Sequence, residues 1–264
     1  MEDAGGGIIL KVCVLASSSA GNCVFVGAGR TRILIDAGLS RKATLERLEA
    51  IGEDPASIGA IFVTHEHSDH VLGLPGLARG LRIPVFLTNL AAPTINWKGV
   101  PPSVETFQAG ACIEFGDLTI QSFTIPHDSV DPVAFTVTAG GIKAGIATDL
   151  GYMPESVKWH LGGCHFLLLE SNHDLDMLKA GPYPWAVKQR VLSRKGHLSN
   201  DSAAEYIQGE LPSEVQTLIL GHLSEHNNHP SIAEITAAQA LERRGLAPRL
   251  IVAIPRREGP VFQL

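Results

Sequence analysis

Short apolar runs alternate with turn-forming residues along the first part of the chain. Lys11–Leu15, Cys23–Val26 and Thr31–Ile35 are rich in apolar and β-branched side chains, which is typical of strands. The segments between them, Ser17–Asn22 and Gly27–Gly29, have the composition of turns. The pattern therefore predicts three strands joined by short connections.

Helical spacing first appears after these strands. Apolar residues recur with a helical period from Arg41 to Ile51, and Gly52 marks the end. The chain then alternates between strands and helices. The later predicted elements are a strand Ala60–Val63, a helix through Leu77, a strand Ile83–Leu87, a short helix near Ala91, strands Cys112–Phe115, Leu118–Thr124, Val133–Val137, Ile142–Thr148 and Phe166–Leu169, helices Pro184–Leu192 and Ser202–Gly209, a strand Thr217–Leu220, a helix Ile232–Arg243 and a strand Leu250–Ile254.

This alternation predicts an α/β fold. No repeat, low-complexity tract or linker divides the chain, so we expect one domain, residues 1–264, built of two similar halves at about 1–138 and 139–264. A chain of 264 residues with 45% hydrophobic content can bury a large core.

The first residues of the chain, its apolar runs and its cysteines indicate the cellular compartment. Met1–Gly7 is acidic and glycine-rich, unlike a secretory signal, and no apolar run approaches the roughly 20 residues that cross a bilayer. We therefore expect a soluble cytoplasmic protein that does not bind membranes. The four cysteines lack a C-x-x-C pair, which argues against a disulfide framework or a thiolate zinc site and predicts small buried residues. They are Cys13, Cys23, Cys112 and Cys164.

The net charge of −6 disfavours a protein whose whole surface grips nucleic acid. One local exception is the segment 177–200, which has basic residues, no acidic ones, and two aromatics, Tyr183 and Trp185, that could stack on bases. The alternative is a solvated amphipathic helix with both aromatics in the core. The candidate substrate-binding residues of this segment are Lys188, Arg190, Arg194 and Lys195.

The most informative motif directly follows the strand Ala60–Val63. Thr64–His70 holds three histidines and two carboxylates in seven residues, although the whole chain has only 11 histidines. The carboxyl end of a strand is where an open α/β sheet presents its ligands. Alternation places His65 and His67 on one side, where they can share an ion. Asp69 and His70 face a second position. Imidazoles with a carboxylate suit zinc, and also manganese or iron.

Three more candidate ligands follow apolar strands. His127 comes after Leu118–Ile125, Asp149 after Ile146–Thr148, and His222 after Leu218–Gly221. Alone, each could be an ordinary cap or turn residue. Together with the first motif they indicate a shared site, and a bridging carboxylate at Asp149 would hold two cations about 3.5–4 Å apart.

The strings THEHSDH, IPHD, ATDLG and LGHLS, in this order, resemble the successive metal motifs of the metallo-β-lactamase superfamily. The resemblance implies a four-layer αβ/βα sandwich, with two mixed sheets flanked by helices. It also implies two divalent ions, one held by His65, His67 and His127 and the other by Asp69, His70 and His222, with Asp149 bridging both.

Longer sequence strings indicate a particular group within this superfamily. LASSSAGNC, ILIDAGLS, LLLESNHD, GPYPWAVKQRVLSRKGHLSN and LGHLSEHNN resemble the YycJ/WalJ-type metallohydrolases from about Val12 to about Pro230. This group is regarded as bacterial 5′-to-3′ DNA exonucleases. The resemblance implies a nucleic acid substrate, DNA rather than RNA, and leaves the oligomeric state open.

Two ions lower the pKa of a bridging water, so hydroxide is the expected nucleophile for phosphodiester hydrolysis. We place Asp69, His197 and Glu170 in catalysis. His197 precedes a capping-box pattern and can meet a phosphate or protonate the leaving oxygen, with Glu170 orienting it. The alternative for His197 is a surface loop histidine. Further substrate-binding candidates, in the serine-rich turn and the ESNHD string, are Ser18, Ser19, Asn22 and Asn172.

Other functions remain open from the sequence. One is a phosphodiesterase for small or cyclic nucleotides, and another is a metal-binding regulatory or scaffold protein. The short spacing from His127 to Asp149 leaves no room for the long tRNA-gripping arm of ribonuclease Z-like enzymes. A secreted β-lactamase is disfavoured because Asp149 stands where those enzymes use cysteine.

Overall fold

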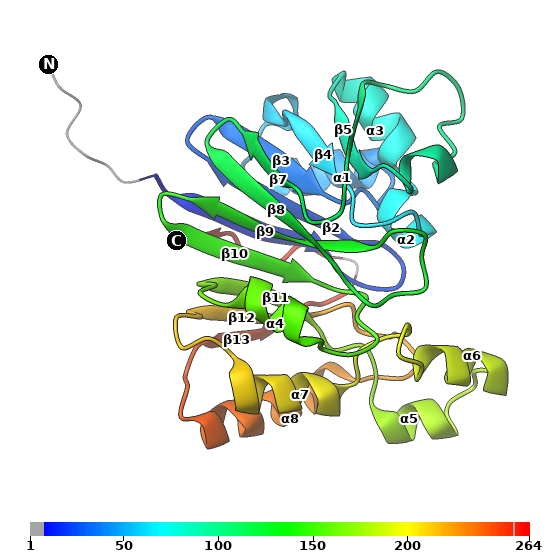
Figure 1. Cartoon of the computed structure of the whole chain (residues 1–264), viewed down its shortest axis with the longest axis vertical. Helices are drawn as coiled ribbons and strands as arrows, with labels where there is room; N and C mark the ends of the chain where they lie inside the picture. The colour runs from blue at the N-terminus through cyan, green and yellow to red at the C-terminus, as the bar shows by residue number, and fades with distance from the viewer. Residues whose placement is uncertain (1–7, 256) are drawn as a thin grey trace, which may run out of the picture.

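The computed structural model describes residues 8–255 and 257–264 and contains two seven-stranded sheets (Figure 1). In spatial order, the first sheet consists of β14 (Phe262–Gln263), β1 (Leu10–Ala16), β2 (Cys23–Ala28), β3 (Thr31–Ile35), β4 (Ala60–Phe62), β5 (Val85–Thr88) and β6 (Val104–Phe107). The second consists of β13 (Arg249–Val252), β12 (Thr217–Gly221), β11 (Phe166–Glu170), β10 (Ile142–Ala147), β9 (Val133–Ala139), β8 (Leu118–Thr124) and β7 (Cys112–Phe115). Both sheets mix parallel and antiparallel pairs.

Helices cover the outer faces of the sheets (Figure 1). The first sheet carries α1 (Arg41–Ala50), α2 (Ser68–Val71) and α3 (Leu74–Leu81), with short 3₁₀ turns at Pro55–Ser57 and Ala92–Thr94. The second carries α4 (Glu155–Leu161), α7 (Asn200–Glu210) and α8 (Pro230–Arg244). The short helices α5 (Leu175–Ala180) and α6 (Trp185–Val191) lie together at one corner of the molecule. No helix in the described ranges is both long and apolar enough to span a bilayer.

Three apolar layers hold the sandwich together. The central layer joins inward-facing side chains of both sheets, and within it Phe62 stacks on Phe86 at 4.4 Å and meets Phe135 edge-on at 6.1 Å. One outer layer packs α1 and α3 against the first sheet, and the other packs α4, α7 and α8 against the second. This confirms the predicted four-layer αβ/βα arrangement.

Strand register determines which residues meet at the edge of the sheets. Parallel pairing sets Ile35 opposite Phe62 in the first sheet. In the second sheet, Ala147 pairs with Leu169 and Glu170 with Gly221. Because parallel strands end at the same edge, the residues that follow β3, β4, β10 and β12 come together there.

Most predicted strands and helices are present, and three strands have the predicted limits, at Thr31–Ile35, Cys112–Phe115 and Leu118–Thr124. The predicted helix through Leu77 is divided into α2 and α3, and the short helix near Ala91 is a 3₁₀ turn. Apart from the 3₁₀ turn Pro55–Ser57, four elements of the described chain were not predicted. β6 is a largely exposed edge strand, β14 has two residues, and α4 and α5 have seven and six, so each carries a weak pattern.

Two other expectations need correction. The sheets divide between β6 and β7, before the expected boundary near residue 138, because β7–β9 pair with β10 and β14 returns to the first sheet. Three cysteines are buried as expected, but Cys112 is exposed because it lies on the edge strand β7. Residues 1–7, which we expect not to be a secretory signal, lie outside the described ranges.

Gly38 allows two loops of the first sheet to approach closely. A Cβ atom at this position would lie 1.7 Å from the Asp69 carbonyl oxygen and 2.7 Å from the Asn22 amide nitrogen. Both atoms belong to the backbone, so the clash can be relieved only by moving a loop. We expect Gly38→Ala to lower the free energy of unfolding by about 1–3 kcal/mol, measured by urea denaturation.

Gly209 in α7 is the matched control, because a Cβ atom there meets nothing within 4 Å. Gly209→Ala should be neutral or stabilising by up to about 1 kcal/mol, since alanine favours a helix. Equal stability of the two variants would show that the contact at Gly38 is not tight.

Candidate metal centre and catalytic cleft

Seven side chains from both sheets meet at the edge where the parallel strands end. His65, His67, Asp69 and His70 come from the segment after β4, His127 follows β8, Asp149 follows β10 and His222 follows β12. They form overlapping groups whose ligand atoms lie within 4.8 Å of one another, so each group could hold a metal ion. The groups drawn only from these seven are His65/His67/His127, Asp69/His70/His222 and His65/His70/Asp149.

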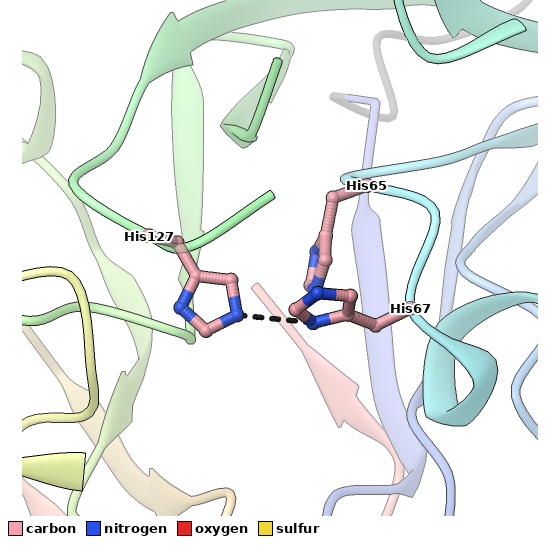
Figure 2. Close-up of side chains that lie close together, drawn as sticks. All are labelled: His65, His67 and His127. Atoms are coloured by element: carbon pink, nitrogen blue, oxygen red, sulfur yellow. Dashed lines mark hydrogen bonds between the residues drawn. The ribbon is translucent and has the colours of Figure 1, made fainter. Parts of the chain in front are cut away.

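Three imidazoles form the first group. His65 and His67 extend from the segment after β4, and His127 approaches from the second sheet (Figure 2). His67 Nδ1 lies 3.2 Å from His127 Nε2. His65 is fully buried, its Nδ1 lies 3.0 Å from the Thr64 hydroxyl, and its Nε2 has no hydrogen-bond partner. A buried nitrogen without a partner is costly unless another ligand satisfies it.

The second group is centred on a carboxylate. Asp69 Oδ2 lies 3.3 Å from His222 Nε2 and 3.4 Å from His70 Nε2. Asp149 connects the two groups, because its Oδ2 lies 3.3 Å from His70 Nε2 and its Oδ1 lies 3.6 Å from His127 Nε2. The positions of these residues agree with the predicted convergence.

Two buried carboxylates orient the histidines of the second group. Asp36 Oδ2 lies 2.8 Å from His70 Nδ1, and Glu170 Oε1 lies 2.8 Å from His222 Nδ1. In both histidines this leaves Nε2 directed at the centre, an arrangement that metal-ligating histidines commonly use. Asp36 was not among the site residues predicted from the sequence. The available signal was its place directly after the strand β3, which matches the other acidic candidates.

Asp36 also ties the two loops of the first sheet together. Its Oδ1 accepts the backbone N–H of Thr64 at 2.8 Å, and the Thr64 hydroxyl donates to the same carboxylate. Since Ile35 and Phe62 are paired, the chain needs only short extensions to make these contacts.

Backbone conformation at the centre is unusual. In the described part of the chain five non-glycine residues have positive φ, and three of them are Asp36 (64°), Asp149 (64°) and His222 (55°). Such conformations are unfavourable for residues with a Cβ and cluster at functional sites. Around His222, Ser17 Oγ accepts its backbone N–H at 2.8 Å and the Asn172 amide donates to its carbonyl at 2.7 Å.

Burial and charge act in opposite directions on these histidines. For His70, burial disfavours the charged ring, but the Asp36 and Asp149 carboxylates outweigh burial and raise its pKa well above the usual value. The carboxylates of Asp149, Asp69 and Glu170 likewise outweigh burial and raise the pKa of His222 well above its usual value. Burial lowers the pKa of His65 and of His127.

The acidic groups of the centre are ionised for a related reason. Burial opposes ionisation of Asp149, yet the neighbouring His222 and His70 hold its pKa well below the usual range. Hydrogen bonds from His222 and His70 likewise outweigh burial at Asp69 and lower its pKa. In the metal-free protein, protonated imidazoles therefore balance these carboxylates.

Glu170 is fully buried and all its hydrogen-bonding capacity is used. Oε1 lies 2.8 Å from both His197 Nδ1 and His222 Nδ1, while Oε2 accepts the backbone N–H groups of Leu150 and Leu198. Burial is outweighed by His197 and His222, and the pKa of Glu170 falls to about 2. Burial opposes charge on His197 as well, but Glu170 outweighs it and raises the pKa of His197.

A cleft of about 230 Å³ opens onto this cluster. His197 lines it beside Asp149, to which its Nδ1 is 3.7 Å away. Of the predicted substrate-binding residues, those that reach the cleft are Ser19, Asn172 and Arg190. Tyr183 also lines the cleft, so this ring is accessible from it.

Other predicted substrate contacts face inward. Lys188 is buried, its ammonium donates to the Lys179 carbonyl at 2.6 Å, and the cleft is lined without it, unlike the position predicted for a substrate contact. Ser18 is buried in its own turn, where its hydroxyl accepts the Ala20 N–H. Asn22 is also buried, and its amide donates to Asp69 Oδ2 at 3.1 Å. Asn22 therefore contacts the centre from its buried side, and Ser18 belongs to the turn that positions Asn22, since its backbone N–H donates to Asn22 Oδ1.

The basic segment is exposed beside the cleft. Arg194 and Lys195 are exposed, and the Arg194 guanidinium lies 4.1 Å from the centre of the Tyr152 ring. Trp185 is 65% exposed, so the alternative of a core residue is wrong for it. The segment thus offers charge and an aromatic surface to solvent.

Comparisons with known proteins agree with this geometry. A model of the Beta-lactamase superfamily domain matches residues 31–222. The chain is 35% identical over 244 residues to the exodeoxyribonuclease YycJ of Bacillus anthracis and 34% identical over 241 residues to the exodeoxyribonuclease WalJ of Streptococcus pneumoniae. Each match covers 89% of this chain and 90% of the relative.

Among solved structures, the metallo-β-lactamase fold protein YhfI from Bacillus subtilis superimposes with a TM-score of 0.75 at 19% identity. The match covers 97% of this chain and 100% of that protein. At this identity the likeness concerns the fold alone.

The opposing effects on the histidines can be measured directly. In the metal-free protein, NMR titration should show His70 and His222 still protonated above pH 6.5, because carboxylates stabilise their charged rings, while His65 and His127 stay neutral there. Asp36→Asn removes one negative charge and should lower the pKa of His70.

His160 on α4 serves as the internal control, because burial and the charge of Lys143, rather than Asp36, lower its pKa. Its titration should not change in Asp36→Asn. A neutral His70 in the unmodified protein at pH 6.5 would contradict the charge balance described for the centre.

Proposed function

The chain belongs to the metallo-β-lactamase superfamily of hydrolases, and from this premise we propose that it is a metal-dependent phosphodiesterase that acts as a DNA exonuclease. The observation that carries the proposal is the convergence of seven His and Asp side chains beside one cleft, which four of them line: His67, Asp69, Asp149 and His222. We also propose that the whole chain works as a single domain, because both sheets supply residues to this cluster.

The donor set suits divalent metal ions. Imidazole nitrogens and carboxylates are the usual ligands of zinc, and also of manganese and iron. The buried Nε2 of His65 has no hydrogen-bond partner in the protein, and neither has the buried Oδ2 of Asp149, so an ion would satisfy both donor atoms. We propose that the centre would hold two ions, one through His65, His67 and His127 and the other through Asp69, His70 and His222, and that Asp149 would be a ligand to both.

Bound ions would make water more acidic and would neutralise the oxygens of a phosphodiester. The protein's own groups handle the protons and the substrate. Asp69 lines the cleft with an ionised carboxylate, and we propose that this carboxylate accepts a proton from the attacking water. His197 carries its proton at the raised pKa that Glu170 maintains, and we propose that it gives this proton to the leaving oxygen.

DNA is the proposed substrate because the YycJ and WalJ relatives are named exodeoxyribonucleases. The exposed Arg194 and Lys195 add positive charge near the cleft, and Trp185 and Tyr183 offer aromatic faces for stacking. A 5′-to-3′ direction rests on the family resemblance alone. Because such an enzyme meets DNA inside the cell, we propose that it works in the cytoplasm.

Substrate class can be tested with three substrates in parallel. The purified protein with Mn²⁺ or Zn²⁺ is offered end-labelled duplex DNA, a structured RNA and bis-p-nitrophenyl phosphate. We expect stepwise shortening of the DNA, with 5′-labelled strands losing their label first, and much slower attack on RNA. Hydrolysis of the small ester alone would favour a small-molecule phosphodiesterase, and inactivity on all three would favour a binding protein.

Asp149 is the sharpest test of the proposed ligands. We expect Asp149→Ala to lose at least half of its bound metal, measured by elemental analysis, and to lose about a hundredfold or more in DNA hydrolysis, because both ions share this carboxylate. Asp201→Ala in the first turn of α7 removes an exposed carboxylate and is the control. Full metal content and full activity in Asp149→Ala would refute the bridging assignment.

A further inference from the structure

An ion pair that the proposed reaction does not use lies at the cleft. Asp128 follows His127, and Arg190 lies near the end of α6. Arg190 Nη2 donates to Asp128 Oδ1 at 3.2 Å, and Arg190 Nε donates to Asp128 Oδ2. Both oxygens of the carboxylate are therefore bound by the fork of the guanidinium.

The pair lies beside the candidate metal centre. Asp128 Oδ1 is 3.5 Å from His127 Nε2, and Arg190 lines the same cleft as Asp149 and His197. The His127 and His67 rings lie close enough to act electrostatically on Asp128, and Asp69, which follows a strand of the first sheet, lies close enough to act on Arg190. The Asp128 carboxylate thus occupies a position surrounded by positive or protonatable groups.

The chemistry of this position suits a second kind of anion. Guanidinium binds carboxylate and phosphate with the same two-point geometry. The side chains of Arg190 and Asp128 are 57% and 29% exposed, and a pair exposed to this degree contributes little net stability. A phosphate group that enters the cleft can therefore take the place of Asp128 on Arg190 at small cost.

The geometry points to a phosphate subsite at the cleft. In the structure, the Asp128 carboxylate occupies the place on Arg190 where a phosphate of the DNA backbone would bind. This inference rests on the proposed function and identifies Asp128 as the residue that competes with the substrate for Arg190. The phosphate is the one next to the scissile bond, because the scissile phosphate itself must reach Asp149 and His197. Without DNA, Asp128 holds the Arg190 guanidinium at the cleft.

A structural brace is the alternative role for Asp128, and it predicts the opposite sign. If Asp128 only positions Arg190 for substrate, its removal weakens DNA binding. If Asp128 competes with phosphate, its removal strengthens binding. The isosteric Asp128→Asn keeps the shape of the side chain and removes only its charge.

The test measures binding of a short fluorescent single-stranded DNA by fluorescence anisotropy. The strand carries phosphorothioate linkages that resist cleavage, and the full-length protein is used with its bound metal. We expect Asp128→Asn to lower Kd by about twofold to fivefold, as removal of a weak competing pair would. Arg190→Lys keeps the charge but loses the fork, and should raise Kd several-fold.

A double variant that combines Asp128→Asn with Arg190→Gln distinguishes competition at the subsite from a general effect of the lost negative charge. In Arg190→Gln, adding Asp128→Asn should change Kd by less than about twofold, because the competition has already been removed. Asp176→Asn is the matched control, since Asp176 pairs with Lys179 on neighbouring α5 and is exposed. It should leave Kd unchanged.

The other possible results of this experiment contradict the phosphate subsite. Unchanged or weaker binding by Asp128→Asn, or equal strengthening with and without Arg190, would overturn the subsite while leaving the exonuclease proposal in place. Failure of the unmodified protein to bind DNA at all would overturn the proposed function and the subsite with it.

Discussion

Hydrogen bonds between buried carboxylates and imidazoles are the constraint on which the centre depends. Asp36 holds His70 and Glu170 holds His222, each at 2.8 Å. Each contact occupies Nδ1 and directs Nε2 inward, so the histidines are oriented before any ion arrives. The contacts exist only because parallel pairing brings the ends of β3 and β4, and of β11 and β12, to the same level.

The centre also requires that the two sheets are packed together. His127 belongs to the second sheet, yet its ring meets His67 of the first. Near this contact the Val133 N–H donates to the Thr64 carbonyl at 3.0 Å, which joins the sheets directly. The apolar layer between the sheets therefore stabilises the fold and the site at once, and loosening it would separate the candidate ligands.

Electrostatics explains how an acidic protein can act on a polyanion. The net charge is −6, but the buried Asp36, Asp149 and Glu170 are matched by histidines within the centre. The exposed positive charge near the cleft comes from the α6 region, where Arg194 and Lys195 face solvent. Positive charge confined to one face favours local binding of nucleic acid without making the whole surface attract it.

The sequence by itself determined the fold class and the candidate ligands. Strand patterns are local, and a His or Asp directly after an apolar strand is visible without knowledge of its neighbours, as for His127, Asp149 and His222. The tertiary structure alone decided which groups are partners. Asp36 supports His70 from 34 residues away, Arg190 binds Asp128 across 62, and Lys188 turns inward to a backbone carbonyl. Such contacts depend on the packing of distant segments, and local periodicity carries no information about that packing.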